Sequence, residues 1–118
     1  MATVSYVAED DATGVVRDVY ADIRKTFGLP AVPNLFKVMA HNPAYLQASW
    51  QRVKVVMGPG LLDRQTKEMI AVAVSATNGC AYCVRAHTAA LRPMGSTDGE
   101  LVDLMAVGDL FSGLNTLL

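Results

Sequence analysis

Apolar side chains recur every three or four residues along most of the chain, which is the spacing of one face of an α-helix. No convincing run of strand-like alternation occurs, no segment repeats, and no linker is long enough to separate domains. The sequence therefore predicts an all-α fold in a single helical domain over residues 1–118. The predicted helices cover residues 13–27, 33–39, 43–57, 63–77 and 80–94, with a last helix from residue 98 onward.

Residues that favour helix ends stand at several of these boundaries. Asn42 and Asp63 can each cap a first turn, and Thr97 begins the sequence TDGE, which has the form of a capping box. The pair Asn78 and Gly79 is typical of a helix C-terminus. The helices on either side of this pair can therefore fold back on each other as a hairpin.

The helix at residues 63–77 has its charges in the first turns and a nearly all-apolar second half. This distribution predicts burial on several sides. Glu68 is the last charge before the apolar run, so we expect it to be half buried, with its pKa raised by desolvation. Large apolar residues at helical spacing are expected to lie in the core or in subunit contacts: Met39, Trp50, Met57 and Met69.

Composition narrows the class of partner. The net charge is −1, which disfavours a nucleic-acid footprint or a polybasic membrane patch. A hydrophobic fraction of 52% in 118 residues indicates that some apolar surface is buried between subunits, so we expect a homo-oligomer. No signal peptide or apolar stretch of about 20 residues is present, and the expected location is the cytoplasm. The apolar end of the chain is typical either of a terminal helix bound to a partner or of a sequence cut short.

The only two cysteines, Cys80 and Cys83, lie beside His87 in the segment NGCAYCVRAH. On a helix, Cys83 and His87 share one face, and the imidazole leans back toward the sulfur, so the two can share a proton. The first turn of a helix favours a thiolate, which is the nucleophilic form of cysteine. The two cysteines are also close enough in sequence to form a short-loop disulfide.

Other interpretations of the pair remain open. Zinc needs four ligands, or three and a water, and this segment supplies at most three. The cysteines could also be two small apolar residues that happen to be three apart. A c-type haem site is excluded because Val84 stands where its histidine is required. His41 precedes a helix cap and is given no role, and Tyr82 is either a pocket wall or a hydroxyl near the thiols.

The predicted hairpin adds a carboxylate to this group. Glu68 lies ten residues before the turn and His87 eight after it, so the two residues would lie at nearly the same height along the paired helices. A carboxylate in that position would orient the imidazole. Glu68, His87, Cys80 and Cys83 therefore form a candidate proton relay and redox centre.

The order Glu68, Cys80, Cys83, His87 has the spacing E-x11-C-x2-C-x3-H, which resembles the signature of AhpD-like alkylhydroperoxidases in the carboxymuconolactone decarboxylase superfamily. The segments PNLFKVMAHNPAYL and TKEMIAVAVSATNGCAYC are also similar to its small peroxidase-related members. The resemblance covers roughly residues 15–95. One departure is Tyr82, where the best-studied members carry a histidine.

The resemblance implies an all-helical protein that forms trimers or hexamers and reduces hydroperoxides without haem, flavin or metal. Cys83 would be the peroxidatic thiol and Cys80 the resolving thiol, with Glu68 and His87 as the proton relay. An external dithiol of the lipoyl or thioredoxin type would restore the thiols. The alternatives are a non-redox acid–base enzyme of the decarboxylase type, which the cysteine pair argues against, and a non-enzymatic thiol redox sensor or assembly module.

Overall fold

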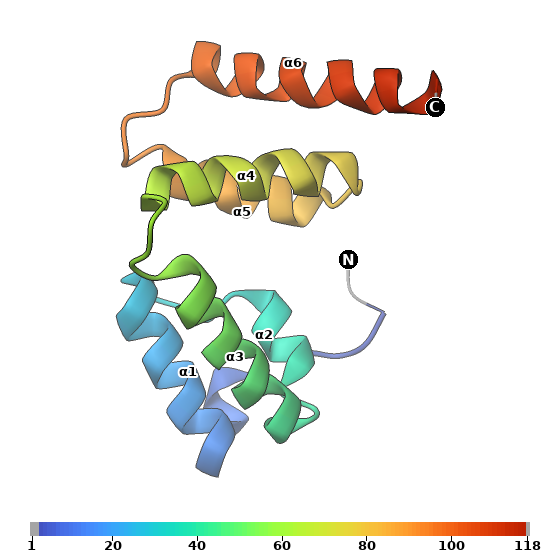
Figure 1. Cartoon of the computed structure of the whole chain (residues 1–118). Coiled ribbons are helices and arrows are strands. Elements are labelled where there is room, and N and C mark those ends of the chain that lie inside the picture. Colours follow the sequence, from blue (N-terminus) through green and yellow to red (C-terminus); the bar gives the residue numbers. More distant parts are fainter. Residues whose placement is uncertain (1–2, 118) are drawn as a thin grey trace. The chain divides into compact units, whose positions relative to one another are not determined.

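The computed structural model describes residues 3–117, and all regular structure in this range is helical (Figure 1). The predicted all-α class is confirmed. Short 3-10 helices lie at Glu9–Asp11 and Asn115–Leu117. The α-helices are α1 (Gly14–Phe27), α2 (Asn34–Met39), α3 (Pro43–Met57), α4 (Arg64–Thr77), α5 (Ala81–Leu91) and α6 (Asp98–Leu114).

The predicted capping residues act as caps. The Asn42 side chain accepts a hydrogen bond from the Tyr45 amide, and Asp63 accepts one from the Thr66 amide at 2.7 Å. The capping box of Thr97 and Glu100 is complete in both directions. These side chains satisfy amides that have no partner within their own helices, which is why the three helices begin where the sequence predicts.

The chain divides into two compact units, with the boundary between Gly58 and Pro59. The first contains α1 to α3 and the second contains α4 to α6. Each unit has its own cluster of buried apolar side chains. The single domain over residues 1–118 stays a prediction.

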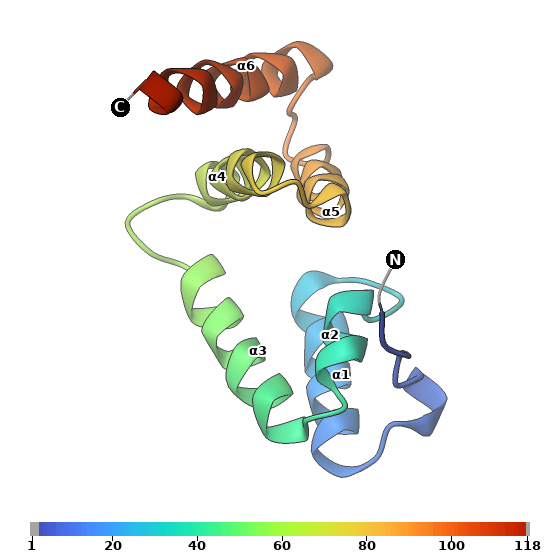
Figure 2. The same cartoon turned by 90° about the vertical axis from the view of Figure 1, so that its right-hand side faces the viewer.

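In the first unit, α1, α2 and α3 lie together (Figure 2). Trp50 belongs to the cluster of buried side chains that these helices share. Its ring meets Phe27 and Phe36 edge-on, with centroids 5.3 and 5.6 Å away. The indole N–H donates to Asp22 Oδ2 at 2.7 Å, and the ammonium of Lys54 donates to the same oxygen. Trp50 is 1% exposed, so the expectation that it lies in the core is confirmed.

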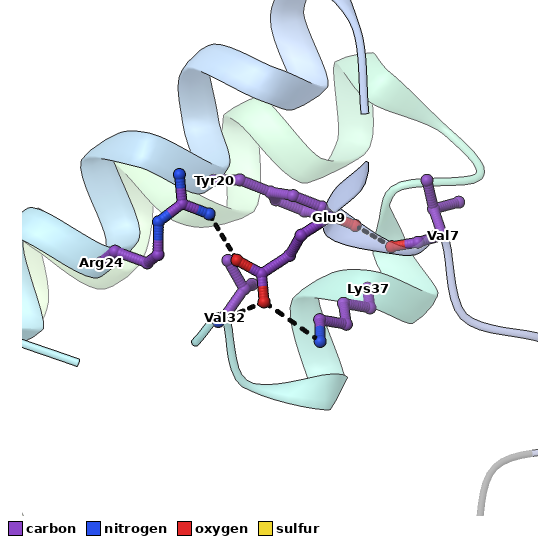
Figure 3. A network of polar contacts seen from close by, with 6 residues as sticks. All are labelled: Val7, Glu9, Tyr20, Arg24, Val32 and Lys37. Atoms are coloured by element: carbon purple, nitrogen blue, oxygen red, sulfur yellow. Dashed lines mark hydrogen bonds and ion pairs between the residues drawn. The ribbon is translucent and has the colours of Figure 1, made fainter. Parts of the chain in front are cut away.

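A carboxylate anchors the N-terminal segment to this unit. Figure 3 shows Glu9 between the side chains of Arg24 and Lys37, with the backbone of Val32 beside it. Glu9 Oε1 accepts from Arg24 at 2.5 Å, and Oε2 accepts from the Val32 amide at 3.2 Å and pairs with Lys37 at 3.4 Å. Glu9 therefore ties residues that come before α1 to α1, to α2 and to the segment between them.

Replacing Glu9 by glutamine is expected to lower the free energy of unfolding by about 1 to 2 kcal/mol at pH 7, because two cations and an amide lose a charged acceptor. Burial opposes the charged form, but the Val32 amide, Arg24 and Lys37 outweigh it and lower the pKa of Glu9. The stability from this group is therefore present above the pKa of the unfolded chain, about 4.3, and is lost as the pH falls through the lower pKa of the folded state.

Denaturant midpoints measured at pH 7 and pH 3 check this prediction. The difference between wild type and Glu9→Gln should shrink at pH 3. Asp10→Asn is the matched control, since Asp10 is an exposed carboxylate in the same 3-10 helix. An equal loss of stability in both variants would contradict the anchoring role of Glu9.

In the second unit, α5 and α6 cover only part of α4. Val72, Leu91 and Leu101 are buried together, with Met69, Leu104 and Met105 packed against them. The prediction that the apolar half of α4 is buried on several sides is wrong for the described chain, because Ile70 and Val74 are 49% and 52% exposed. Each of them lies two residues from Val72, which puts them on the side of α4 away from the buried cluster.

The last helix also carries exposed apolar side chains, among them Val102, Val107, Leu110 and Phe111. Surface of this kind is typical of interfaces, and the homo-oligomer stays a prediction. Leu118, the last residue of the apolar end, lies outside the described residues. Among residues 3–117, no helix has the length and apolar character that a membrane span requires.

Candidate active site at the turn between α4 and α5

A tight turn at Asn78 and Gly79 joins α4 to α5. Gly79 has φ 73°, a backbone conformation that only glycine adopts readily, and the Cys80 amide donates back to Ser75 O at 2.9 Å. The chain therefore reverses within a few residues, and α4 and α5 lie side by side in both views (Figures 1 and 2). The predicted hairpin is present.

The two cysteines form a disulfide at the start of α5, with their Cα atoms 5.3 Å apart. The sequence predicts that Cys80 begins the helix, but the helix begins at Ala81 and Cys80 is its N-cap. The reason is local: Cys80 Sγ accepts a hydrogen bond from the Cys83 amide at 3.3 Å, as a capping side chain does. Both sulfurs thus belong to the amide-rich end of α5, and the structure holds the oxidised form of the pair.

The hairpin places Glu68 of α4 against His87 of α5, with Glu68 Oε2 2.6 Å from His87 Nδ1. His87 follows Cys83 by four residues, or one helical turn, so the two side chains belong to the same face of α5. The His87 side chain is 35% exposed, whereas Glu68 is 2% exposed. The structure therefore joins Glu68 to His87 and Cys80 to Cys83, and the two pairs lie one helical turn apart along α5. That the four residues act as one site stays a prediction.

Two expectations about Glu68 are wrong. It is fully buried and not half buried, and its pKa lies below its ordinary value. Desolvation does raise the pKa, as expected, but the hydrogen bonds from His87 and Arg64 and their charges lower it by more. Glu68 is therefore ionised at neutral pH.

An ionised Glu68 determines which ring nitrogen of His87 can act as a base. A carboxylate only accepts hydrogen bonds, so Nδ1 must carry the proton that points at Oε2. In the neutral ring, Nε2 is then the nitrogen with a free lone pair. The arrangement can take up and return a proton at Nε2.

Arg64 is a site residue that was not predicted from the sequence. Its Nε and Nη2 lie 2.9 and 2.8 Å from Glu68 Oε1, so it holds the oxygen that His87 does not contact. The signal was the spacing of four residues between Arg64 and Glu68, which places an opposite-charge pair on one helix face. Tyr82 is 43% exposed. His41 contacts the backbone oxygen of Ser5 in the first unit.

The candidate site does not offer the ligand set of a metal centre. Within residues 3–117, no three His, Cys, Asp or Glu side chains are grouped closely enough to bind one. The carboxylate of Glu68 is engaged by Arg64 and His87, and the sulfurs are engaged with each other.

Comparisons with known proteins agree with this geometry. The carboxymuconolactone decarboxylase family matches residues 43–118. The crystal structure of the alkylhydroperoxidase AhpD core from Rhodospirillum rubrum superposes with a TM-score of 0.91 at 40% identity, covering 99% of this chain and 88% of that one. This likeness extends over α1 to α6.

Curated relatives include an alkyl hydroperoxide reductase of Mycobacterium tuberculosis, 36% identical over 78% of this chain, and AhpD of Azorhizobium caulinodans, 37% identical over 65%. The matched parts span only 26% and 42% of those relatives' own lengths. The fold neighbour, in contrast, is covered almost throughout. The chain therefore belongs to the carboxymuconolactone decarboxylase family, in its AhpD-like branch.

Proposed function

We propose that this protein is a thiol-dependent alkyl hydroperoxide reductase with Cys83 as peroxidatic thiol, Cys80 as resolving thiol, and Glu68 and His87 managing the proton. The observation that carries the proposal is a disulfide at a helix N-terminus with a buried carboxylate–imidazole pair one turn away. The names of the relatives and of the fold neighbour support the same activity.

The first step is attack of the Cys83 thiolate on the distal oxygen of ROOH. The S–O bond forms and the O–O bond breaks, which oxidises the sulfur to a sulfenic acid and releases an alcohol. His87 Nε2 takes the thiol proton beforehand and returns it to the departing alkoxide. The amides at the start of α5 favour the thiolate over the thiol.

The second step is condensation of Cys80 with the sulfenic acid, which forms the disulfide and releases water. The disulfide between Cys80 and Cys83 in the structure supports this step, because the step would form the same bond. An external dithiol then exchanges with the disulfide and leaves oxidised. Over the cycle, one hydroperoxide and one dithiol give one alcohol, one water and one oxidised dithiol.

The wider proposal includes the remaining expectations from the sequence. The substrate is an organic hydroperoxide, and the reductant is a dithiol of the lipoyl or thioredoxin type. The protein works as a homo-oligomer in the cytoplasm, with residues 1–118 acting as one domain. The exposed apolar side chains of α4 and α6 support the oligomer.

A stoichiometric assay tests the activity. Reduced, metal-free protein is mixed anaerobically with tert-butyl hydroperoxide in the absence of any reductant. We expect one equivalent of hydroperoxide to be consumed per chain, with loss of two titratable thiols, and continuous turnover once dihydrolipoamide is added. If the thiols close with diamide but no hydroperoxide is consumed, the proposal fails and a redox sensor is the better interpretation.

Membership of the family also supports a second candidate, an acid–base enzyme acting on a lactone through Glu68 and His87. Such an enzyme does not need sulfur. Its activity on a lactone substrate should survive in the double variant Cys80→Ser, Cys83→Ser, whereas peroxidase activity should not.

A further inference from the structure

Arg64 contacts the buried carboxylate of Glu68 from the first turn of α4, although its own side chain is 41% exposed. It is the first residue of α4, directly after the cap Asp63, and one turn before Glu68. Two guanidinium nitrogens lie within 2.9 Å of Glu68 Oε1, while His87 Nδ1 lies 2.6 Å from Oε2. Each oxygen of this buried carboxylate therefore has its own donor.

The separate donors on the two oxygens of Glu68 affect whether this carboxylate can take up a proton. A buried carboxyl with only an imidazole beside it could exchange a proton with that imidazole, and the pair would share the charge. Arginine does not give up its charge in proteins, so its contact with Oε1 disfavours protonation of Glu68. With both oxygens engaged, Glu68 can orient His87 without carrying the proton itself.

We propose that Arg64 is a positioning residue, which holds Glu68 as a fixed carboxylate so that Glu68 orients His87 and His87 alone moves the proton. The catalytic part of this inference rests on the proposed peroxidase function, whereas the effect of Arg64 on Glu68 does not. In the two-member relay expected from the sequence, both Glu68 and His87 would handle the proton. In this proposal only His87 gains and loses the proton, and Glu68 stays ionised throughout.

Arg64 and His87 provide the hydrogen bonds to the two oxygens of Glu68, one from each of the paired helices. Arg64 from α4 and His87 from α5 are the groups whose hydrogen bonds and charges lower the pKa of Glu68. The other helix packed on α4 is α6, whose acidic residues are all exposed: Asp98, Glu100, Asp103 and Asp109. The test can therefore concentrate on Arg64.

The test uses Arg64→Met, which keeps an unbranched apolar stem and removes the guanidinium, together with Arg64→Lys. The Glu68 carboxyl carbon is followed by NMR as a function of pH in the disulfide form of each protein. We expect the Glu68 midpoint to rise by about one pH unit in Arg64→Met, and by less in Arg64→Lys, which keeps a point charge without the planar fork.

The His87 ring gives a second readout. At a pH where the ring is neutral, its nitrogen shifts should report a single tautomer with the proton on Nδ1 in wild type, and this preference should weaken in Arg64→Met, in which Glu68 Oε1 has lost its donor and the carboxylate can turn away from Nδ1. Arg92→Met is the matched control, because Arg92 pairs with the exposed Asp98. Titration curves of Arg64→Met that superimpose on those of wild type would overturn the proposal, whatever the activity.

The pH profile of hydroperoxide consumption tests the catalytic part. The decline at low pH should begin about one unit higher in Arg64→Met than in wild type, and the rate there should approach that of Glu68→Gln. A lower rate with an unshifted profile and unshifted titration would show that Arg64 is only structural, and would overturn the proposal. A wild type that consumes no hydroperoxide would defeat the proposed function while leaving the NMR result to decide the role of Arg64.

Discussion

Cys83→Ser is expected to lower the rate of hydroperoxide reduction by at least about a thousandfold, measured with the reduced protein and excess dithiol. A serine hydroxyl is not ionised at neutral pH and cannot form the sulfenic acid on which the second step depends. The expected loss is large because the nucleophile, and not an orienting group, is removed. Loss of activity without loss of helical circular dichroism would show that the effect is chemical.

Cys80→Ser is the matched comparison. It should still consume one equivalent of hydroperoxide per chain, but the reaction should stop at a sulfenic acid on Cys83 that dimedone can trap. Serine is a good N-cap residue, so α5 should begin at the same place in this variant. The two substitutions therefore separate attack from resolution while leaving the fold in place.

The structure contains one contact that favours the opposite assignment. The Cys83 amide donates to Cys80 Sγ, and the same hydrogen bond would stabilise a thiolate on Cys80 in the reduced protein. The position of His87, one turn after Cys83, favours Cys83. If Cys83→Ser consumes one equivalent of hydroperoxide and Cys80→Ser consumes none, the roles of the two cysteines are reversed.

The helices and their ends were predictable because their causes are local. Apolar spacing, the caps at Asn42, Asp63 and Thr97, and the turn at Gly79 each act within a few residues of chain. Glu68 and His87 were also predictable as neighbours, since a tight turn between two helices determines which residues lie level. The contact between Glu68 and His87 could therefore be predicted from the sequence alone.

Effects that depend on several distant groups were not predictable. The direction in which the pKa of Glu68 shifts depends on the balance between burial and two donors, His87 and Arg64, and Arg64 was not predicted from the sequence. The Glu9 anchor joins residues 15 and 23 positions apart, and no local signal indicates it. Partial exposure of α4 depends on which helices cover it, which periodicity does not specify.

Trp50→Ala is expected to have the largest effect on stability, about 3 to 5 kcal/mol, because the substitution leaves a cavity in the centre of the first unit. Trp50 is among the largest fully buried side chains, and its loss also removes two edge-on aromatic contacts. Domains of this size are stable by only about 5 to 15 kcal/mol, so this loss is a large part of the total. Denaturant unfolding followed by circular dichroism measures it, since Trp50 is the only tryptophan and its fluorescence is lost in the variant.

Two further variants separate packing from hydrogen bonding at Trp50. Trp50→Phe keeps an aromatic ring between Phe27 and Phe36 but loses the donor to Asp22 Oδ2, which Lys54 still contacts, so we expect a cost of about 1 to 2 kcal/mol. Tyr45→Ala removes an aromatic side chain that is 56% exposed on the same helix, and its effect should stay within about 0.5 kcal/mol. If Trp50→Ala costs no more than Tyr45→Ala, the cluster around Trp50 does not stabilise the first unit. If Trp50→Phe costs as much as Trp50→Ala, the bond to Asp22 matters more than the packing of the ring.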